Sequence, residues 1–242
     1  MTDVHVVGAG PAGSVFAREA AKRGLGVLVS EEHAQIGAPV QCAGLVSREG
    51  LDSLGIDYSS AVMNEIHGAD IYVPSLSCMS VGNGRPRAFV VDRQRLDSLL
   101  GDSAASAGAE IEKGSRIGMR SLRGRLIVGA DGASSSVAEW FRFPKIAQYV
   151  ICMQAEFSGA RIADPQRIAM FISNEHFPGL FGWAIPVGDG RLRVGIGVNA
   201  EKGKELCARF GRFLAENRIV SEMVSGAVEK GRISGIIPVS AR

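Results

Sequence analysis

Three glycines near the start of the chain have the spacing of a phosphate-binding turn. Gly8, Gly10 and Gly13 stand in the stretch VVGAGPAGS. In such a turn the first glycine permits a tight bend, the second lets the backbone approach a pyrophosphate, and the third lets a helix pack closely on a strand. Together with Ala12 in the same turn, they predict a site for a dinucleotide cofactor.

The elements around this turn are those that a dinucleotide site needs. Residues 3–7 and 26–30 are apolar runs typical of buried strands, and residues 11–23 predict a helix that begins at a proline. The helix N-terminus offers free amide donors and partial positive charge to phosphates. Glu31 follows the second strand, where its carboxylate can accept hydrogen bonds from a ribose, which argues against a 2′-phosphate. FAD and NAD proteins share this pattern. Replacing Glu31 with Ala is expected to weaken cofactor binding with little effect on folding.

The composition of the chain limits the classes of protein to which it can belong. The chain has 242 residues, of which 46% are hydrophobic, so it can bury the core of one large domain or of two interleaved small ones. Its formal net charge is only +2. The sequence contains no long run of Lys or Arg, which argues against nucleic-acid binding. Its four cysteines are widely spaced without a metal-ligand pattern, which argues against a zinc site and favours reduced cytoplasmic thiols. Because the first strand starts by about residue 3 and no apolar stretch approaches about 18 residues, neither a signal peptide nor a membrane span is expected.

Four further segments carry a family resemblance. Residues 29–47 read VSEEHAQIGAPVQCAGLVS, and residues 89–100 read FVVDRQRLDSLL, a strand that enters a helix with an apolar face of Leu96, Leu99 and Leu100. Residues 126–137 read LIVGADGASSSV, a predicted buried strand that ends in Gly-Ala-Asp-Gly, and residues 178–198 read PGLFGWAIPVGDGRLRVGIGV. In this order the sequence resembles the FAD-dependent geranylgeranyl reductase family, in particular the archaeal digeranylgeranylglycerophospholipid reductase type, over nearly its whole length. That family lies within a larger group of flavoproteins that includes the aromatic hydroxylases.

The resemblance implies FAD as the cofactor and places further residues beside it. These positions are Cys42, Ala43, Gly44, Arg93, Asp131 and Gly132. In the family, the guanidinium matched by Arg93 faces the flavin, and the small residues at 42–44 run along its reactive side. Simpler interpretations remain: Arg93 as a surface residue at a helix start, Asp131 as a turn former, and Cys42 as a small buried residue.

The segment 178–198 resembles the reductases' substrate signature, Pro-Gly-x-Tyr-x-Trp-x-Phe-Pro. Phe181 stands where the family usually has Tyr, and Ile185 where it usually has Phe. Phe181 and Trp183 are the predicted substrate-binding residues, because an apolar aromatic wall without titratable groups suits an isoprenoid chain. The alternative is that both are ordinary core aromatics. Beyond them, residues 191–198 alternate as a half-buried strand, and residues 201–217 predict an amphipathic helix.

Two departures from the family pattern bear on cofactor binding. Residues 113–125 form only a short basic connector where relatives insert a longer β-meander. After a strand like GRISGIIPV, relatives carry a second flavin-contacting segment, Gly-Asp-Ala-Ala, which is absent before Arg242. We therefore expect weakened FAD affinity unless a second polypeptide supplies this segment. A naturally truncated homologue and a fragment of a longer chain are the other interpretations.

The predicted architecture is an α/β fold of the aromatic-hydroxylase-like flavoprotein type. A Rossmann-like three-layer FAD-binding domain, residues 1–60 and 88–146, is interleaved with an antiparallel β-sheet substrate domain, residues 61–87 and 147–242. The expected activity is reduction of geranylgeranyl double bonds of a prenyl lipid by hydride from reduced flavin, with ferredoxin or a reduced nicotinamide as external electron donor. No catalytic side chain and no metal site is identifiable. The expected location is cytoplasmic, with peripheral attachment to a membrane surface left open.

Two alternative functions remain open at this point. A flavin-dependent monooxygenase or electron-transfer oxidoreductase could use the same scaffold if Phe181 and Ile185 signify a different pocket. A non-catalytic nucleotide-binding subunit, completed by a partner chain, could keep the fold without the chemistry.

Overall fold

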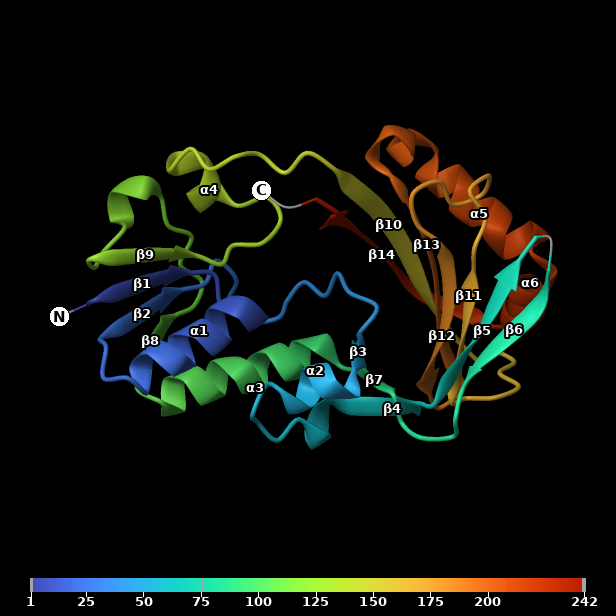
Figure 1. Cartoon of the computed structure of the whole chain (residues 1–242), viewed down its shortest axis with the longest axis horizontal. Coiled ribbons are helices and arrows are strands. Elements are labelled where there is room, and N and C mark those ends of the chain that lie inside the picture. The colour runs from blue at the N-terminus through green and yellow to red at the C-terminus, as the bar shows by residue number, and fades with distance from the viewer. Residues whose placement is uncertain (1, 75, 241–242) are drawn as a thin grey trace.

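The computed structural model describes residues 2–74 and 76–240. Its strands form three sheets of four, three and seven strands. The four-stranded sheet lies at one end of the molecule and the seven-stranded sheet at the other, with the three-stranded sheet between them (Figure 1). The chain passes repeatedly between the sheets, so segments far apart in sequence build each of them.

The four-stranded sheet is parallel, with the strand order β8–β2–β1–β9. Its strands are β1 (Val4–Val7), β2 (Val27–Ser30), β8 (Glu110–Glu112) and β9 (Leu126–Gly129). The helices α1 (Pro11–Ala21) and α3 (Arg93–Ser106) pack together along one face, and α4 (Ser136–Trp140) follows β9 (Figure 1). A short helical turn, η2 (Met119–Ser121), precedes β9. The predicted Rossmann-like unit is thereby confirmed.

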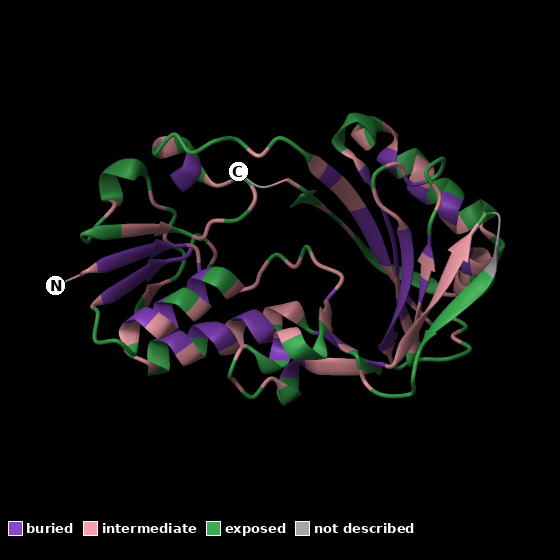
Figure 2. Cartoon of the chain, viewed as in Figure 1, coloured by how far each residue is buried: buried purple, intermediate pink, exposed green. Residues whose placement is uncertain are grey.

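One predicted feature of this sheet is wrong. The strand at residues 126–129 was expected to be buried, but β9 is the edge strand of the sheet and Leu126 is 52% exposed. Figure 2 shows the contrast with β1 and β2, whose residues are all buried. An apolar run alone does not tell an edge strand from a central one.

The three-stranded sheet is antiparallel, with the order β3–β7–β4. Its elements are β3 (Leu45–Ser47), β7 (Ala88–Val91) and β4 (Val62–Ile66), with α2 (Arg48–Asp52) and the turn η1 (Ser59–Ala61) beside them. The predicted domain boundary at residue 61 assigns β4 to the substrate domain, yet β4 pairs with β7 of the other domain. Since only His67 separates β4 from the first strand of the large sheet, the two sheets are joined almost directly. The division into domains stays a prediction.

The seven-stranded sheet has the order β14–β10–β13–β12–β11–β5–β6. Its strands are β5 (Gly68–Val73), β6 (Leu76–Gly82), β10 (Tyr149–Ser158), β11 (Arg167–Phe171), β12 (Gly182–Gly188), β13 (Arg191–Asn199) and β14 (Val228–Pro238). Neighbouring strands are antiparallel except for the parallel pair of β5 and β11. The predicted antiparallel sheet is therefore present with one parallel junction.

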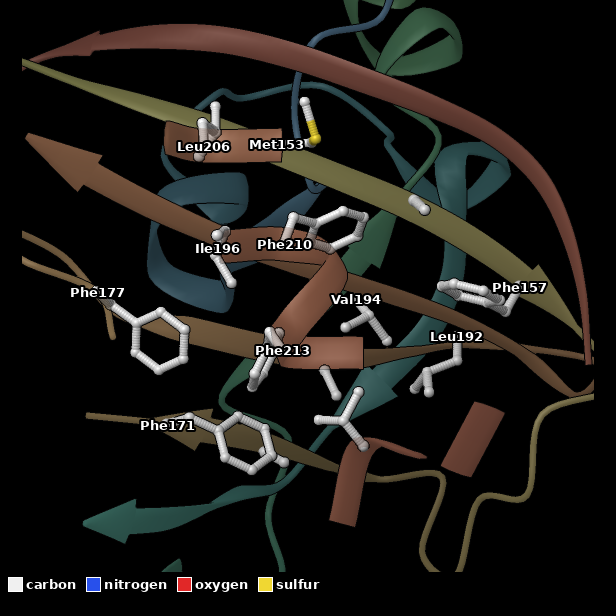
Figure 3. Close-up of a cluster of buried hydrophobic side chains, with 14 of the residues drawn as sticks. Met153, Phe157, Phe171, Phe177, Leu192, Val194, Ile196, Leu206, Phe210 and Phe213 are labelled. Carbon is white, nitrogen blue, oxygen red and sulfur yellow. The ribbon is translucent and has the colours of Figure 1, made fainter. Parts of the chain in front are cut away.

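The outer face of this sheet is covered by α5 (Leu206–Glu216) and α6 (Arg218–Val224), which follow the turn η3 (Ala200–Glu205). The predicted apolar face of β13 is confirmed, because Leu192, Val194, Ile196 and Val198 are at most 1% exposed. All four belong to one buried cluster with Phe210 and Phe213 of α5, in which Figure 3 labels Leu192, Val194 and Ile196. Over the described residues, every helix is too short or too polar to cross a membrane.

The opposite face of β13 is also covered, so the strand is more deeply buried than predicted. A Cβ atom added at Gly195 would lie 2.3 Å from the Trp183 ring, and one at Gly197 would lie 2.2 Å from Leu180. Glycine at both positions lets larger side chains of the chain lie flat against this strand.

Candidate functional site

A cavity of about 650 Å³ opens at the carboxyl ends of β1, β2 and β9. We call it the glycine-turn cavity. Most of its lining residues are polar or lie in loops, and they include Gly8, Gly10, Glu31, His33, Cys42, Arg93, Asp97, Ser115, Asp131, Gly132 and Trp140. In open parallel sheets, ligands bind in the crevice outside the carboxyl ends of the strands. Seven predicted cofactor residues thus come together from five places in the chain: Gly8 and Gly10, Glu31, Cys42, Arg93, and Asp131 and Gly132.

The glycine turn forms the floor of this cavity. Gly8 has a φ of +98°, and a Cβ atom there would lie 2.5 Å from the carbonyl oxygen of Ala130. A Cβ atom at Gly13 would lie 2.0 Å from the carbonyl oxygen of Gly8, so α1 packs directly on the end of β1. Around Gly10, by contrast, the space within 4 Å of an added Cβ atom is empty. Ala12 is exposed on the first turn of α1 and does not line the cavity.

Glu31 is fixed by hydrogen bonds at one wall of the cavity. One carboxylate oxygen accepts from the amide of Ala9 at 2.8 Å, and the other accepts from the amide of His33 at 3.0 Å and contacts its Nδ1 at 2.8 Å. Burial opposes the charged form, but these bonds outweigh it and lower the pKa of the Glu31 carboxyl. The carboxylate is therefore charged at neutral pH and retains lone pairs for a further donor.

Arg93 reaches the cavity from the start of α3. Its guanidinium pairs with Asp97 one turn later, at 3.1 Å between Nη2 and Oδ1. Burial raises the pKa of the Asp97 carboxyl against the attraction of Arg93. For Arg93, burial is outweighed by the charge of Asp97 and by Cys42, so the pKa of the guanidinium is raised. Arg93 and Cys42 thus lie near each other in the cavity lining, and contact of either with a flavin stays a prediction.

Asp131 and Gly132 line the cavity just beyond β9. The Asp131 carboxylate accepts hydrogen bonds from the hydroxyl of Ser135 and, at 3.1 Å, from the amide of Val137. It therefore organises the start of α4. Gly132 has a φ of +80°, which favours glycine. The turn-forming role considered for Asp131 is present, and contact with a cofactor stays a prediction.

Ala43 and Gly44 follow Cys42 but do not line the cavity. Ala43 and Leu45 instead pack against a buried apolar cluster made of Ile66, Val90, Trp183, Ile185 and Val187, which we call the Trp183 cluster. This cluster fills the space between the three-stranded sheet and the inner face of the seven-stranded sheet.

The two predicted substrate residues belong to this cluster rather than to the glycine-turn cavity. Trp183 is 8% exposed, and its Nε1 donates to Oε1 of Gln154 at 2.9 Å. Phe181 is partly buried and meets the Trp183 ring edge-on, with 6.1 Å between ring centroids. The structure therefore gives both residues a packing role, and substrate contact stays a prediction.

Sequence reasoning missed two segments that line the cavity. Residues 115–117 line the cavity beside the end of β2, where the Ser115 amide donates to the Glu31 carbonyl at 2.8 Å. Residues 37–41 pack on α3, and a Cβ atom at Gly37 would lie 2.9 Å from the Cα of Gln94. The glycine at position 37 was a signal for a turn that the sequence contains, because its φ of +83° is one that favours glycine. Residues 115–117 gave none, because their contact with the end of β2 is long-range.

The cavity fits a dinucleotide cofactor. Gly10 precedes α1 without a side-chain cap, and the first turn of α1 contains no acidic residue. The first amides of a helix have no partner within the helix, so those of α1 are free to receive an anion. The open space beside Gly10 lets such an anion approach them, and Glu31 lies within the same cavity as an acceptor for hydroxyl groups.

Comparison with known proteins agrees with this geometry. Residues 6–69 match the NAD(P)-binding Rossmann-like domain family. Among solved structures, a geranylgeranyl bacteriochlorophyll reductase-like protein from Thermoplasma acidophilum superposes with a TM-score of 0.84 at 26% identity, covering 98% of this chain and 66% of that one. A flavin-dependent brominase superposes with a TM-score of 0.78 at 18% identity, covering 98% of this chain and 68% of that one, which shows a shared fold.

The curated relatives identify the family more narrowly than the solved structures do. The digeranylgeranylglycerophospholipid reductase of Methanosarcina acetivorans is 32% identical over 98% of this chain and 67% of its own length. A second reductase of that name, from Methanothrix thermoacetophila, is 32% identical over 97% of this chain and 68% of its own length. The chain thus spans about two thirds of the length of these relatives. It belongs to the digeranylgeranylglycerophospholipid reductase family of flavoproteins.

Proposed function

We propose that the chain is an FAD-dependent reductase that saturates isoprenoid double bonds of a prenyl lipid, with the geranylgeranyl group as substrate. The observation that carries this proposal is the path of residues 42–45. Cys42 lines the glycine-turn cavity, while Ala43 and Leu45 pack on the Trp183 cluster. Within four residues the chain passes from a polar dinucleotide site to an apolar wall, the pair of environments that this reaction requires.

The residues of the chain have separable tasks in this proposal. The α1 N-terminus and Gly10 hold the pyrophosphate, and Glu31 accepts from the adenosine ribose. Arg93 presents positive charge on the side of Cys42. When bound and reduced, FAD supplies the hydride. The Trp183 cluster excludes water, and the partly buried Leu180 and Phe181 packed against it would offer apolar surface, the main source of affinity that a hydrocarbon chain provides.

The partners follow from the same chemistry. An external donor, ferredoxin or a reduced nicotinamide, supplies electrons. The prenyl lipid is met at a membrane surface from the cytoplasmic side, so attachment to that surface would be peripheral.

The cofactor is tested by calorimetry with FAD and NAD on the purified chain. We expect FAD to be preferred and Gly10→Ala to weaken its binding by at least about tenfold, because the added methyl group enters the space left for the pyrophosphate. Gly211→Ala is the matched control, since its Cβ atom also meets open space but on α5, away from the cavity. Equal affinity in both variants would show that the cofactor does not lie over Gly10.

The reaction is tested under anaerobic conditions with chemically reduced protein and a geranylgeranyl lipid. Mass spectrometry should show products heavier by two hydrogens for each reduced bond. Bound and reduced flavin with an unchanged lipid, together with hydroxylation of an aromatic substrate in oxygen, would support the monooxygenase alternative. A chain that binds neither cofactor would support the interaction-subunit alternative.

A further inference from the structure

Arg193 is a largely but not fully buried cation on the inner face of the seven-stranded sheet. It lies on β13 between Leu192 and Val194, whose side chains face the other way into the core with α5. Its side chain is 12% exposed, and its Nε donates to Oε2 of Glu156 at 2.9 Å on the neighbouring strand β10. Burying a guanidinium is costly unless it is paired, so Glu156 stabilises it in this position.

The free end of the same guanidinium leaves the sheet and reaches the 42–44 loop. Nη1 of Arg193 donates to the carbonyl oxygen of Ala43 at 2.8 Å. Gly44 makes this approach possible, because a Cβ atom there would lie 2.8 Å from that nitrogen and 2.5 Å from the carbonyl oxygen of Val91. Gly44 also has a φ of +77°, so the backbone conformation and the contact both favour glycine.

The 42–44 loop thus has an arginine on each of two sides, and Arg193 is the one with a hydrogen bond to its backbone. Arg93 lies beside Cys42 on the α3 side, within the glycine-turn cavity. On the other side, Arg193 of the seven-stranded sheet donates to the carbonyl of Ala43. In that sheet Arg193 is the pairing partner of Ile185, a member of the Trp183 cluster. A planar guanidinium can donate in two directions at once, whereas an ammonium group is a compact point charge without this fixed fork.

We propose that Arg193 is a positioning residue that fixes the 42–44 loop between the cofactor and the apolar wall by bridging Glu156 and the Ala43 carbonyl. The inference rests on the proposed function for its catalytic meaning. Its structural content, the attachment of the loop to the sheet, does not depend on any cofactor.

The thiol of Cys42 reports the attachment directly. Peptide-resolved mass spectrometry can follow the alkylation of Cys42 in the chain without added FAD, with the exposed Cys78 and Cys207 as internal references. Arg193→Gln should raise the Cys42 rate by about tenfold, because loss of a charge-assisted hydrogen bond favours local opening of the loop.

Arg191→Gln is the matched control. Arg191 pairs with the same Glu156 at 3.4 Å and is separated from Arg193 by one residue, but in the described structure it makes no hydrogen bond to the loop. This variant should leave the Cys42 rate within about twofold of wild type, and Arg193→Lys should fall between. An unchanged Cys42 rate in folded Arg193→Gln, or an equal rise in Arg191→Gln, overturns the proposal.

Kinetics separate this proposal from the function it rests on. With FAD bound, Arg193→Gln should lower kcat for the prenyl lipid by about tenfold while KM changes less than about threefold, and Lys should restore part of kcat. Absence of FAD binding in the wild-type chain refutes the proposed function and leaves the alkylation result to decide on the loop. A faster Cys42 rate with unchanged kcat refutes the catalytic meaning of the attachment alone.

Discussion

The glycine-turn cavity and the Trp183 cluster lie on either side of residues 42–45, yet they are built in opposite ways. The cavity is lined largely by loops and backbone groups whose positions depend on hydrogen bonds, such as that from Ala9 to Glu31. The cluster is made of side chains from β4, β7 and β12 that pack without charged members. A polar site of this kind tolerates few changes of hydrogen bonding, whereas an apolar one responds chiefly to volume.

The largest expected effect concerns Trp183. We expect Trp183→Ala to lower the free energy of unfolding by about 3–5 kcal/mol, the range for truncating a large buried aromatic. The side chain is 8% exposed, and its loss also removes the donor to Gln154. Urea denaturation followed by circular dichroism measures the change. Phe181→Ala, which removes the partly buried neighbour, is the control and should cost less.

The Trp183 prediction also tests the substrate assignment. If Trp183→Ala keeps its unfolding midpoint but loses prenyl-lipid turnover, the indole contacts substrate rather than core. That result would make the Trp183 cluster a binding surface like the glycine-turn cavity, rather than a packing unit.

The second largest expected effect concerns Glu31 in the glycine-turn cavity. Glu31→Ala should weaken FAD binding by about 1.5–3 kcal/mol, the range for a hydrogen bond to a charged group. The structure revises the expectation that folding changes little, because the amides of Ala9 and His33 both lose their acceptor. Stability should fall by about 1–3 kcal/mol. Glu32→Ala removes an exposed carboxylate in the same cavity and should change neither FAD affinity nor the free energy of unfolding. Calorimetry measures the affinity of both variants, and urea denaturation measures their stability.

The smallest effect is a dependence on pH confined to one half of the molecule. His5 is buried in β1, its Nδ1 accepts from the Arg123 amide at 3.0 Å, and its Nε2 contacts the hydroxyl of Ser30. Burial, followed by the charge of Arg123, lowers the pKa of the imidazole below its ordinary 6.5. The unfolded chain therefore binds the proton more tightly, so stability is complete above about pH 6.5 and falls below it by at most about 1.4 kcal/mol per pH unit.

The two tryptophans separate the halves in this experiment. Trp140 lines the glycine-turn cavity and Trp183 lies in the apolar cluster. In variants that retain one tryptophan each, fluorescence of Trp140 should respond to urea more readily at pH 5.5 than at pH 7, and His5→Gln should reduce the difference. An equal pH response of Trp183 would show that both halves unfold together.

The residues of the cavity that could be predicted from the sequence are those with local backbone requirements. Gly8, Gly13 and Glu31 were recognisable because the residues of a βαβ turn lie close together in sequence and each has a backbone requirement. The outward face of β9 was not, since exposure depends on which strand stands at the sheet edge. The contact of Arg193 with Ala43 joins segments with no shared sequence pattern, so only the folded chain brings it into view.

The central place of β1 has a consequence for biosynthesis. Val4 pairs with Leu126, and the turn after β1 closes against Ala130, so the cavity needs segments from distant parts of the chain. A ribosome-bound chain that has not yet released β9 carries all three glycines but lacks one wall of the cavity. Until then the side of β1 that faces β9 remains unpaired. The pairing of β1 with β9 joins distant parts of the chain, and such long-range contacts slow the folding of parallel sheets. Cofactor capture during translation must therefore wait for the strand that the sequence places last in this sheet.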